Sequence, residues 1–270
     1  MNDTTLAKRF SIERVALLAR NRILDEASVV GIGSAAILAL NLLGVLLARK
    51  AFFNAHGFGG GLWVPAIVVG GLLLAAQAFK GMHDGKSGTD WVLLPATPLE
   101  KYAAAFAESV LIYPLAAAVL AMAASAALSL VERLAGGPGG AIWTPFGLRA
   151  LRAWADYAIA ATVLLAGSSA LRKAALLKTA GLAMAYGLVI GLVLSLGFWA
   201  IFGGGSADIS IIGGMGRSFS FSGAGRDISE AALRAIRIGA DAACYAVLPA
   251  FAILFGAAKV AEKESRDEVQ

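Results

Sequence analysis

The stretch AAAFAESVLIYPLAAAVLAMAASAALSLV at 103–131 decides the fold class. Glu108 is the only charged residue in the whole run. A helix needs about 20 mostly apolar residues to cross the roughly 30 Å hydrocarbon core of a bilayer, where no water satisfies free peptide groups. The run is long enough, and it predicts a membrane-spanning helix.

Other apolar runs of comparable length indicate that this helix is one of six. They lie at 28–48, 61–79, 152–171, 175–202 and 235–258. The composition agrees, since 59% of the residues are hydrophobic and 15% are charged, against about 25% charged in soluble domains. We therefore predict an all-α integral membrane protein with six transmembrane helices. It forms a single domain over 1–270, because the spans leave no segment for a separate aqueous core.

The distribution of Lys and Arg predicts the orientation of these helices. Most of the 23 basic residues fall in segments that share one side of the membrane with the N-terminus. Because basic loops stay in the cytoplasm, we expect both termini inside, in a bacterial inner membrane. The net charge of +5 then reflects topology and contact with anionic lipid. No basic helix or stripe suits base recognition, so we expect no nucleic-acid partner.

Two segments outside the runs have patterns of their own. Apolar residues recur at helical spacing between charged residues at 10–27, which predicts an amphipathic helix on the inner membrane surface. A cytoplasmic extension of the first span is the alternative. The extracytoplasmic segment 203–233 is rich in glycine and contains ISII and RSFSF, so it predicts a flexible loop in which a short hairpin can form.

The inner segment 80–102 is the most informative connection. It passes from glycine-rich turns to WVLLPATP and then to a helix start, where Thr97 can cap the helix and Pro98 and Glu100 suit the first turn. A proline-limited elbow of this kind is rigid. We expect the segment to be a cytoplasmic loop with a fixed geometry.

Apolar side chains in this loop suit a partner's groove. Trp91, Leu93 and Leu94 could serve as anchors, with Asp90, Glu100 and Lys101 as a charged rim. The other interpretation places Trp91 in the interfacial aromatic belt. The spacing favours neither of the two.

Polar residues within the apolar runs are candidate functional groups, because an ionisable side chain is unfavourable inside a membrane. They are Gln77, Glu108, Asp156 and Asp241. All lie within two turns of a run's end, which favours interfacial solvation or local pairing over a substrate relay. The single cysteine, Cys244, provides neither a disulfide nor a metal cluster.

Two motifs resemble those of a known family. WVLLPATPLEKY at 91–102 is similar to the "LLPAS, one residue or two, EK" signature of bacterial ATP-binding-cassette (ABC) permeases of the type-2 exporter class. LAGSSALRKAALLKTA at 165–180 resembles the segment where a span of these proteins ends and a basic pair turns the chain on the inner face. The chain has Ala96-Thr97 where Ala-Ser is commoner.

The resemblance implies a permease subunit that pairs with a second permease copy or paralogue and with separate ABC ATPase subunits. No G-x-x-x-x-G-K-[ST] motif is present, so ATP would be bound by the partner and this chain would hold no cofactor. In this family the inner loop contacts the ATPase, so the resemblance implies that 80–102 is a cytoplasmic coupling loop. That role carries over to Trp91, Leu94, Pro95, Thr97, Glu100 and Lys101. The N-terminal helix and Arg172, Lys173 and Lys178 are secondary candidates.

Two alternatives belong to other functional classes. An intramembrane enzyme needs a nucleophile with its base or a cluster of metal ligands, but His56 and His83 fall in loops on opposite sides under this topology. A membrane scaffold without transport activity has no motif of its own. We therefore expect no catalytic and no metal-binding residues.

Overall fold

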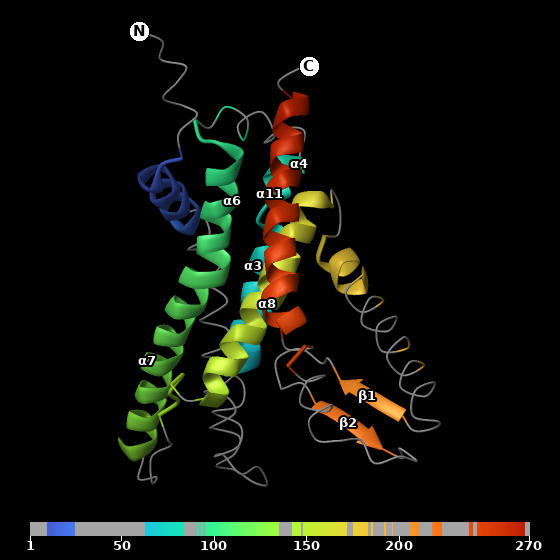
Figure 1. The fold of residues 1–270 in the computed structure, drawn as a ribbon. Helices are drawn as coiled ribbons and strands as arrows, with labels where there is room; N and C mark the ends of the chain where they lie inside the picture. The colour runs from blue at the N-terminus through green and yellow to red at the C-terminus, as the bar shows by residue number, and fades with distance from the viewer. Residues whose placement is uncertain are drawn as a thin grey trace.

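In the computed structural model the described elements are helices, apart from one short β-hairpin (Figure 1). The residues that it describes are 10–24, 63–83, 91, 93, 95–134, 142–146, 148–171, 175–182, 185, 192, 196, 206–210, 218–222, 238–239 and 242–267. The first predicted span, 28–48, lies outside them.

One long helical rod corresponds to the predicted span at 103–131. It consists of α6 (Pro98–Phe106), the π-helix η2 (Ala107–Ile112) and α7 (Tyr113–Leu134), joined end to end. The other long helices are α3 (Trp63–Gln77), α8 (Leu148–Ala170) and α11 (Leu248–Asp267), which follows the π-helix η3 (Ala243–Val247). The last helix therefore continues beyond the predicted run at 235–258.

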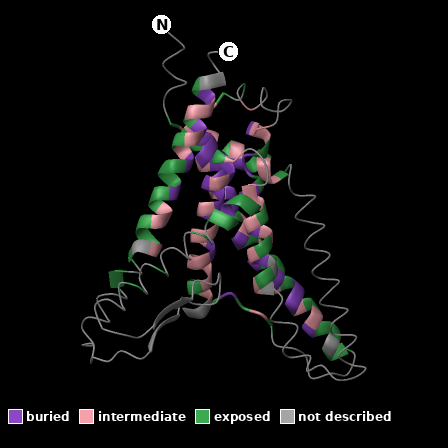
Figure 2. Ribbon diagram, turned by 90° about the vertical axis from the view of Figure 1, so that its right-hand side faces the viewer, coloured by how far each residue is buried: buried purple, intermediate pink, exposed green. Residues whose placement is uncertain are grey.

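These helices pack around α8. Both α11 and α3 lie against it, and α11 also contacts α6. Close approach depends on small residues: a β-carbon at Gly71 would overlap the Tyr157 ring, and one at Gly256 would overlap the Tyr102 ring. Figure 2 shows buried residues in the middle of the bundle and exposed residues along its outer sides.

Two helices among the described residues are long and apolar enough to cross a membrane. They are Pro98–Val131 and Cys244–Ser265. Only 33% of the most apolar stretch of the first helix and 17% of that of the second are buried inside the protein. Helices in the core of a soluble protein would be mostly buried, whereas lipid-facing helices expose apolar side chains. The two helices are thus compatible with a membrane protein.

Shorter elements complete the fold. Residues 12–24 form a helix within the predicted amphipathic segment, and Figure 1 shows it crossing the rod beside α6. α4 (Lys80–His83) continues from α3 after a turn, so the start of the coupling loop is helical. The segment predicted as a flexible loop contains the short hairpin that the sequence allows, formed by antiparallel β1 (Ser206–Ser210) and β2 (Ser218–Ser222), with Ser206 opposite Ser222.

Candidate functional site

The predicted helix start at the end of the coupling loop is confirmed. It has a capping box in which both reciprocal hydrogen bonds are present. The Glu100 backbone N–H donates to Thr97 Oγ1 at 3.3 Å, and the Thr97 N–H donates to Glu100 Oε2 at 2.8 Å. Pro98 occupies the first turn. A reciprocal cap satisfies two backbone donors that the helix itself cannot, so the direction in which α6 leaves the loop is well determined.

The second oxygen of Glu100 attaches this cap to helix 12–24. Glu100 Oε1 accepts hydrogen bonds from the Ser11 N–H at 2.6 Å and from Arg14 Nη2 at 2.8 Å. The Glu100 side chain is completely buried. A buried carboxylate is stable only with a cation and several donors around it, and this one has both.

The neighbouring residue, Lys101, attaches α6 to the last helix. Its Nζ donates to Glu264 Oε1 and to the Trp91 carbonyl, both at 2.7 Å, and lies 5.6 Å from the centre of the Trp91 ring. The exposed fractions of the Lys101 and Glu264 side chains are 2% and 11%. Two adjacent residues in the first turn of α6, Glu100 and Lys101, thus attach this helix to helix 12–24 and to α11.

A cluster of aromatic side chains also packs against this part of α6. The Phe79 ring stacks on Tyr102 at a centroid distance of 5.8 Å and meets Trp91 edge-on at 5.7 Å. Phe79, Tyr102, Leu165 and Val260 are buried in one core cluster, with Trp91 packed against it. We call residues 91–101, held by this cluster and by the ion pairs of Glu100 and Lys101, the elbow.

The elbow corrects one expectation about the coupling loop. Glu100 and Lys101 do not form a solvent-exposed charged rim, because both are buried in ion pairs within the chain. Among the described residues of the elbow, the exposed apolar side chains are Leu93, which is 75% exposed, Leu99, which is 54% exposed, and Pro95. The sequence did not single out Leu99, because the packing of α6 decides that Leu99 is exposed while Glu100 and Lys101 are buried.

A further ion pair connects helix 12–24 to the π-helix. Arg22 Nε lies 2.5 Å from Glu108 Oε2, and Arg22 Nη2 donates to the Ala78 carbonyl at 2.9 Å. The Tyr157 hydroxyl of α8 donates to the Ser109 carbonyl of η2 at 2.5 Å. π-Helical turns are frequent at functional sites, and this one is held from two sides.

The other predicted site residues are dispersed. Asp156 is half-buried and accepts a hydrogen bond from the Tyr245 hydroxyl at 2.8 Å. This partner and Arg22, the partner of Glu108, are both more than 80 residues away in the chain, so neither carboxylate has the local pairing that the sequence favoured. Gln77 is exposed at the end of α3, and Lys178 is exposed in the helical segment 175–182. The remaining positions, Leu94, Arg172, Lys173 and Asp241, lie outside the described residues.

Three residues that complete the elbow and the π-helix contact were not predicted. Arg14, Arg22 and Glu264 pair with acidic or basic residues that are 86 to 163 positions away. In the sequence they look like ordinary charges on amphipathic or terminal helices. One indirect signal was present in the sequence: if Glu100 and Lys101 were buried at the helix start, each would need a side chain of opposite charge nearby.

Metal chemistry has no support in the described part of the chain. No group of three His, Cys, Asp or Glu side chains there could hold a metal ion. His83 instead donates from Nε2 to the Ser168 carbonyl at 3.1 Å, which joins α4 to the end of α8. His83 is therefore part of the helix packing and not a residue of a solvated loop.

Comparisons of the chain with protein-family models, with curated proteins and with solved structures find no match. A functional assignment must therefore come from the motifs in the sequence and from the geometry of the elbow.

Proposed function

We propose that this chain is the membrane-spanning permease subunit of an ATP-driven ABC transporter of the type-2 exporter class. It would have six transmembrane helices with both termini in the cytoplasm of a bacterium and would lie in the inner membrane. The support is the resemblance of 91–102 and 165–180 to that family, together with helices that are compatible with a membrane.

The observation that carries the proposal is the construction of the elbow. A force applied to a flexible loop is lost in loop motion, whereas a force applied to a rigid element moves the helices attached to it. Here Glu100 and Lys101 connect the start of the 98–134 rod to helix 12–24 and to α11 through buried ion pairs. A push on the elbow would therefore tilt several helices together.

The exposed side chains of the elbow suit a partner. Leu93 and Leu99 are large, apolar and exposed, and they lie on either side of Pro95. Apolar anchors of this kind enter hydrophobic grooves at protein interfaces. We infer that the groove belongs to a separate ATPase, whose closure on ATP would drive the opening of a path between this subunit and a second permease copy or paralogue.

Co-purification tests the proposal directly. The tagged chain is extracted from the membranes of its native host in a mild detergent after chemical cross-linking, and the recovered proteins are identified by mass spectrometry. We expect stoichiometric recovery of a protein with a Walker ATP-binding motif. Recovery of the chain without such an ATPase would contradict the proposal and favour a membrane scaffold.

A further inference from the structure

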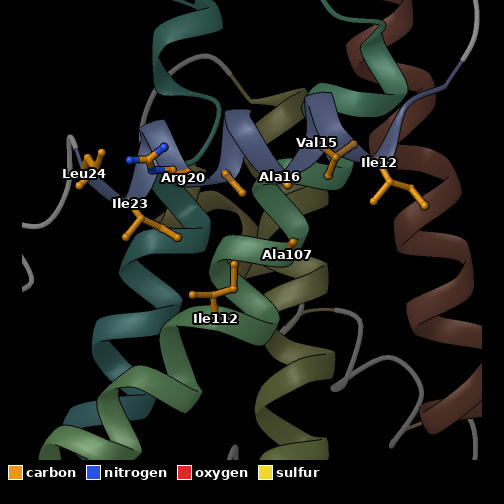
Figure 3. Close-up of a pocket in the computed structure, with 9 residues that line it drawn as sticks. Ile12, Val15, Ala16, Arg20, Ile23, Leu24, Ala107 and Ile112 are labelled. Atoms are coloured by element: carbon orange, nitrogen blue, oxygen red, sulfur yellow. The ribbon is translucent and has the colours of Figure 1, made fainter.

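A groove of about 410 Å³ lies between helix 12–24 and the rod at η2 (Figure 3). This volume is within the range of about 300–1,000 Å³ that is usual for sites that bind small molecules. Among the described residues that line the groove, Arg20 is the only polar one. Figure 3 shows Ile12, Val15 and Ile23 extending from the helix toward the side on which Ile112 lies.

The groove continues into an apolar surface that faces outward. Ile112 lines the groove and is 37% exposed, and Leu115, one turn further along the rod, is 65% exposed. Ile12 at the other end of the groove is 77% exposed. An apolar channel that opens onto an apolar helix face is accessible to a hydrocarbon chain from the side.

Charge identifies the head of the occupant. Helix 12–24 has three arginines, and two of them, Arg14 and Arg22, are neutralised by the buried Glu100 and Glu108. Arg20 is exposed and forms no ion pair with any described residue. Its guanidinium stays level with the helix in Figure 3, while the apolar side chains extend away from it. This arrangement is complementary to an anionic group attached to an apolar tail.

We propose that the groove binds one anionic phospholipid of the inner leaflet, with an acyl chain along Val15, Ile23 and Ile112 and the phosphate at Arg20. This inference rests on the membrane location in the proposed function. The lipid would fill the space between helix 12–24 and η2, so its binding would change how strongly the helix is held against the rod.

Native mass spectrometry of the full chain in detergent tests the site. The protein is titrated with palmitoyl-oleoyl phosphatidylglycerol and with the matching phosphatidylcholine. We expect one phosphatidylglycerol to bind about fivefold more tightly than phosphatidylcholine, the factor typical of one basic residue at an anionic surface. Arg20→Gln should remove this preference, whereas Arg20→Lys and the control Arg152→Gln, at an exposed arginine of α8, should keep it.

A second variant tests the tail of the lipid. Ala16→Phe places a ring in the groove from an exposed position of helix 12–24, and it should weaken the binding of both lipids while thermal unfolding stays as in the parent protein. Unchanged preference in Arg20→Gln, or unchanged binding of both lipids in Ala16→Phe, would overturn the inference. Absence of the chain from the membrane fraction would instead contradict the proposed function, so the two failures are distinguishable.

Discussion

The guanidinium of Arg14 lies 2.8 Å from the buried carboxylate of Glu100, although 86 residues separate them in the chain. The contact holds the start of helix 12–24 against the cap of α6, because the same carboxylate oxygen also accepts from the Ser11 N–H. A single side chain thus caps the start of α6 and holds the start of helix 12–24. Stability measurements can show how much the elbow depends on this contact.

Arg14→Met should reduce the free energy of unfolding by about 3 kcal/mol, because it leaves a completely buried carboxylate without its cation. Thermal unfolding in detergent, followed by tryptophan fluorescence, measures the change. Arg20→Met is the matched control on the same helix, and its effect should be within about 0.5 kcal/mol because the side chain is exposed. Equal effects of the two variants would contradict the role of Arg14.

Glu264→Gln should destabilise the protein by about 3–5 kcal/mol, since the Lys101 ammonium, 2% exposed, would lose its countercharge. The double variant Lys101→Met/Glu264→Met leaves no buried charge and should be closer to the parent protein than either single change. Glu262→Gln disrupts the exposed pair with Lys259 and should cost less than about 1 kcal/mol. Additive effects of the two Met changes would disprove the coupling.

Gly70→Ala should destabilise the protein by about 1–3 kcal/mol, because the new methyl group would overlap the Tyr113 hydroxyl. The overlap involves mainly the hydroxyl oxygen, so adding Tyr113→Phe should recover much of the loss. Gly181→Ala is the control, since no atom lies within 4 Å of a β-carbon at that position. The unfolding temperatures of these three variants and the parent protein decide the question, and a failure of Tyr113→Phe to rescue would contradict the packing.

Tyr157→Phe should cost about 1–3 kcal/mol, because it leaves the buried Ser109 carbonyl without the hydroxyl that satisfies it in the π-helix. Tyr102→Phe is the matched control. Within the described residues the buried Tyr102 hydroxyl has no hydrogen-bond partner, so its removal should be neutral or slightly stabilising. The same unfolding assay compares the two, and the reverse order of effects would refute the assignment.

The double variant Leu93→Asn/Leu99→Asn should abolish co-purification of the ATPase while the chain remains in the membrane at its usual level. Both side chains are exposed, so their replacement should leave the fold intact. Leu134→Asn, at an 80% exposed leucine at the far end of α7, should retain the ATPase. Normal ATPase recovery with the elbow variant would contradict docking through these two leucines.

Local features of the chain were predictable because each depends on neighbours in the sequence. The cap at Thr97 and Glu100 follows from side chains three positions apart, and the hairpin at 206–222 follows from strand-forming residues between glycines. Most of the helix at 98–134 follows from the long apolar run at 103–131. None of these needs information about a distant segment.

The elbow's charges could not be assigned in this way. Glu100 and Lys101 looked like a solvated rim, because charged residues at a helix start are usually exposed. Their burial depends on where helix 12–24 and α11 cross α6, and these helices are 86 and 163 residues away in the chain. The exposed positions of Leu93 and Leu99 depend on the same crossings.

The sequence by itself determined that the chain is dominated by long apolar helices, where its rod begins and which segment can form a hairpin, since short-range sterics, capping and hydrophobic length decide these features. Only the tertiary structure decided which charges are buried together and which apolar side chains remain for a partner or a lipid. The physical reason is that an ion pair or a groove exists only after distant helices have packed, and no local pattern specifies that packing.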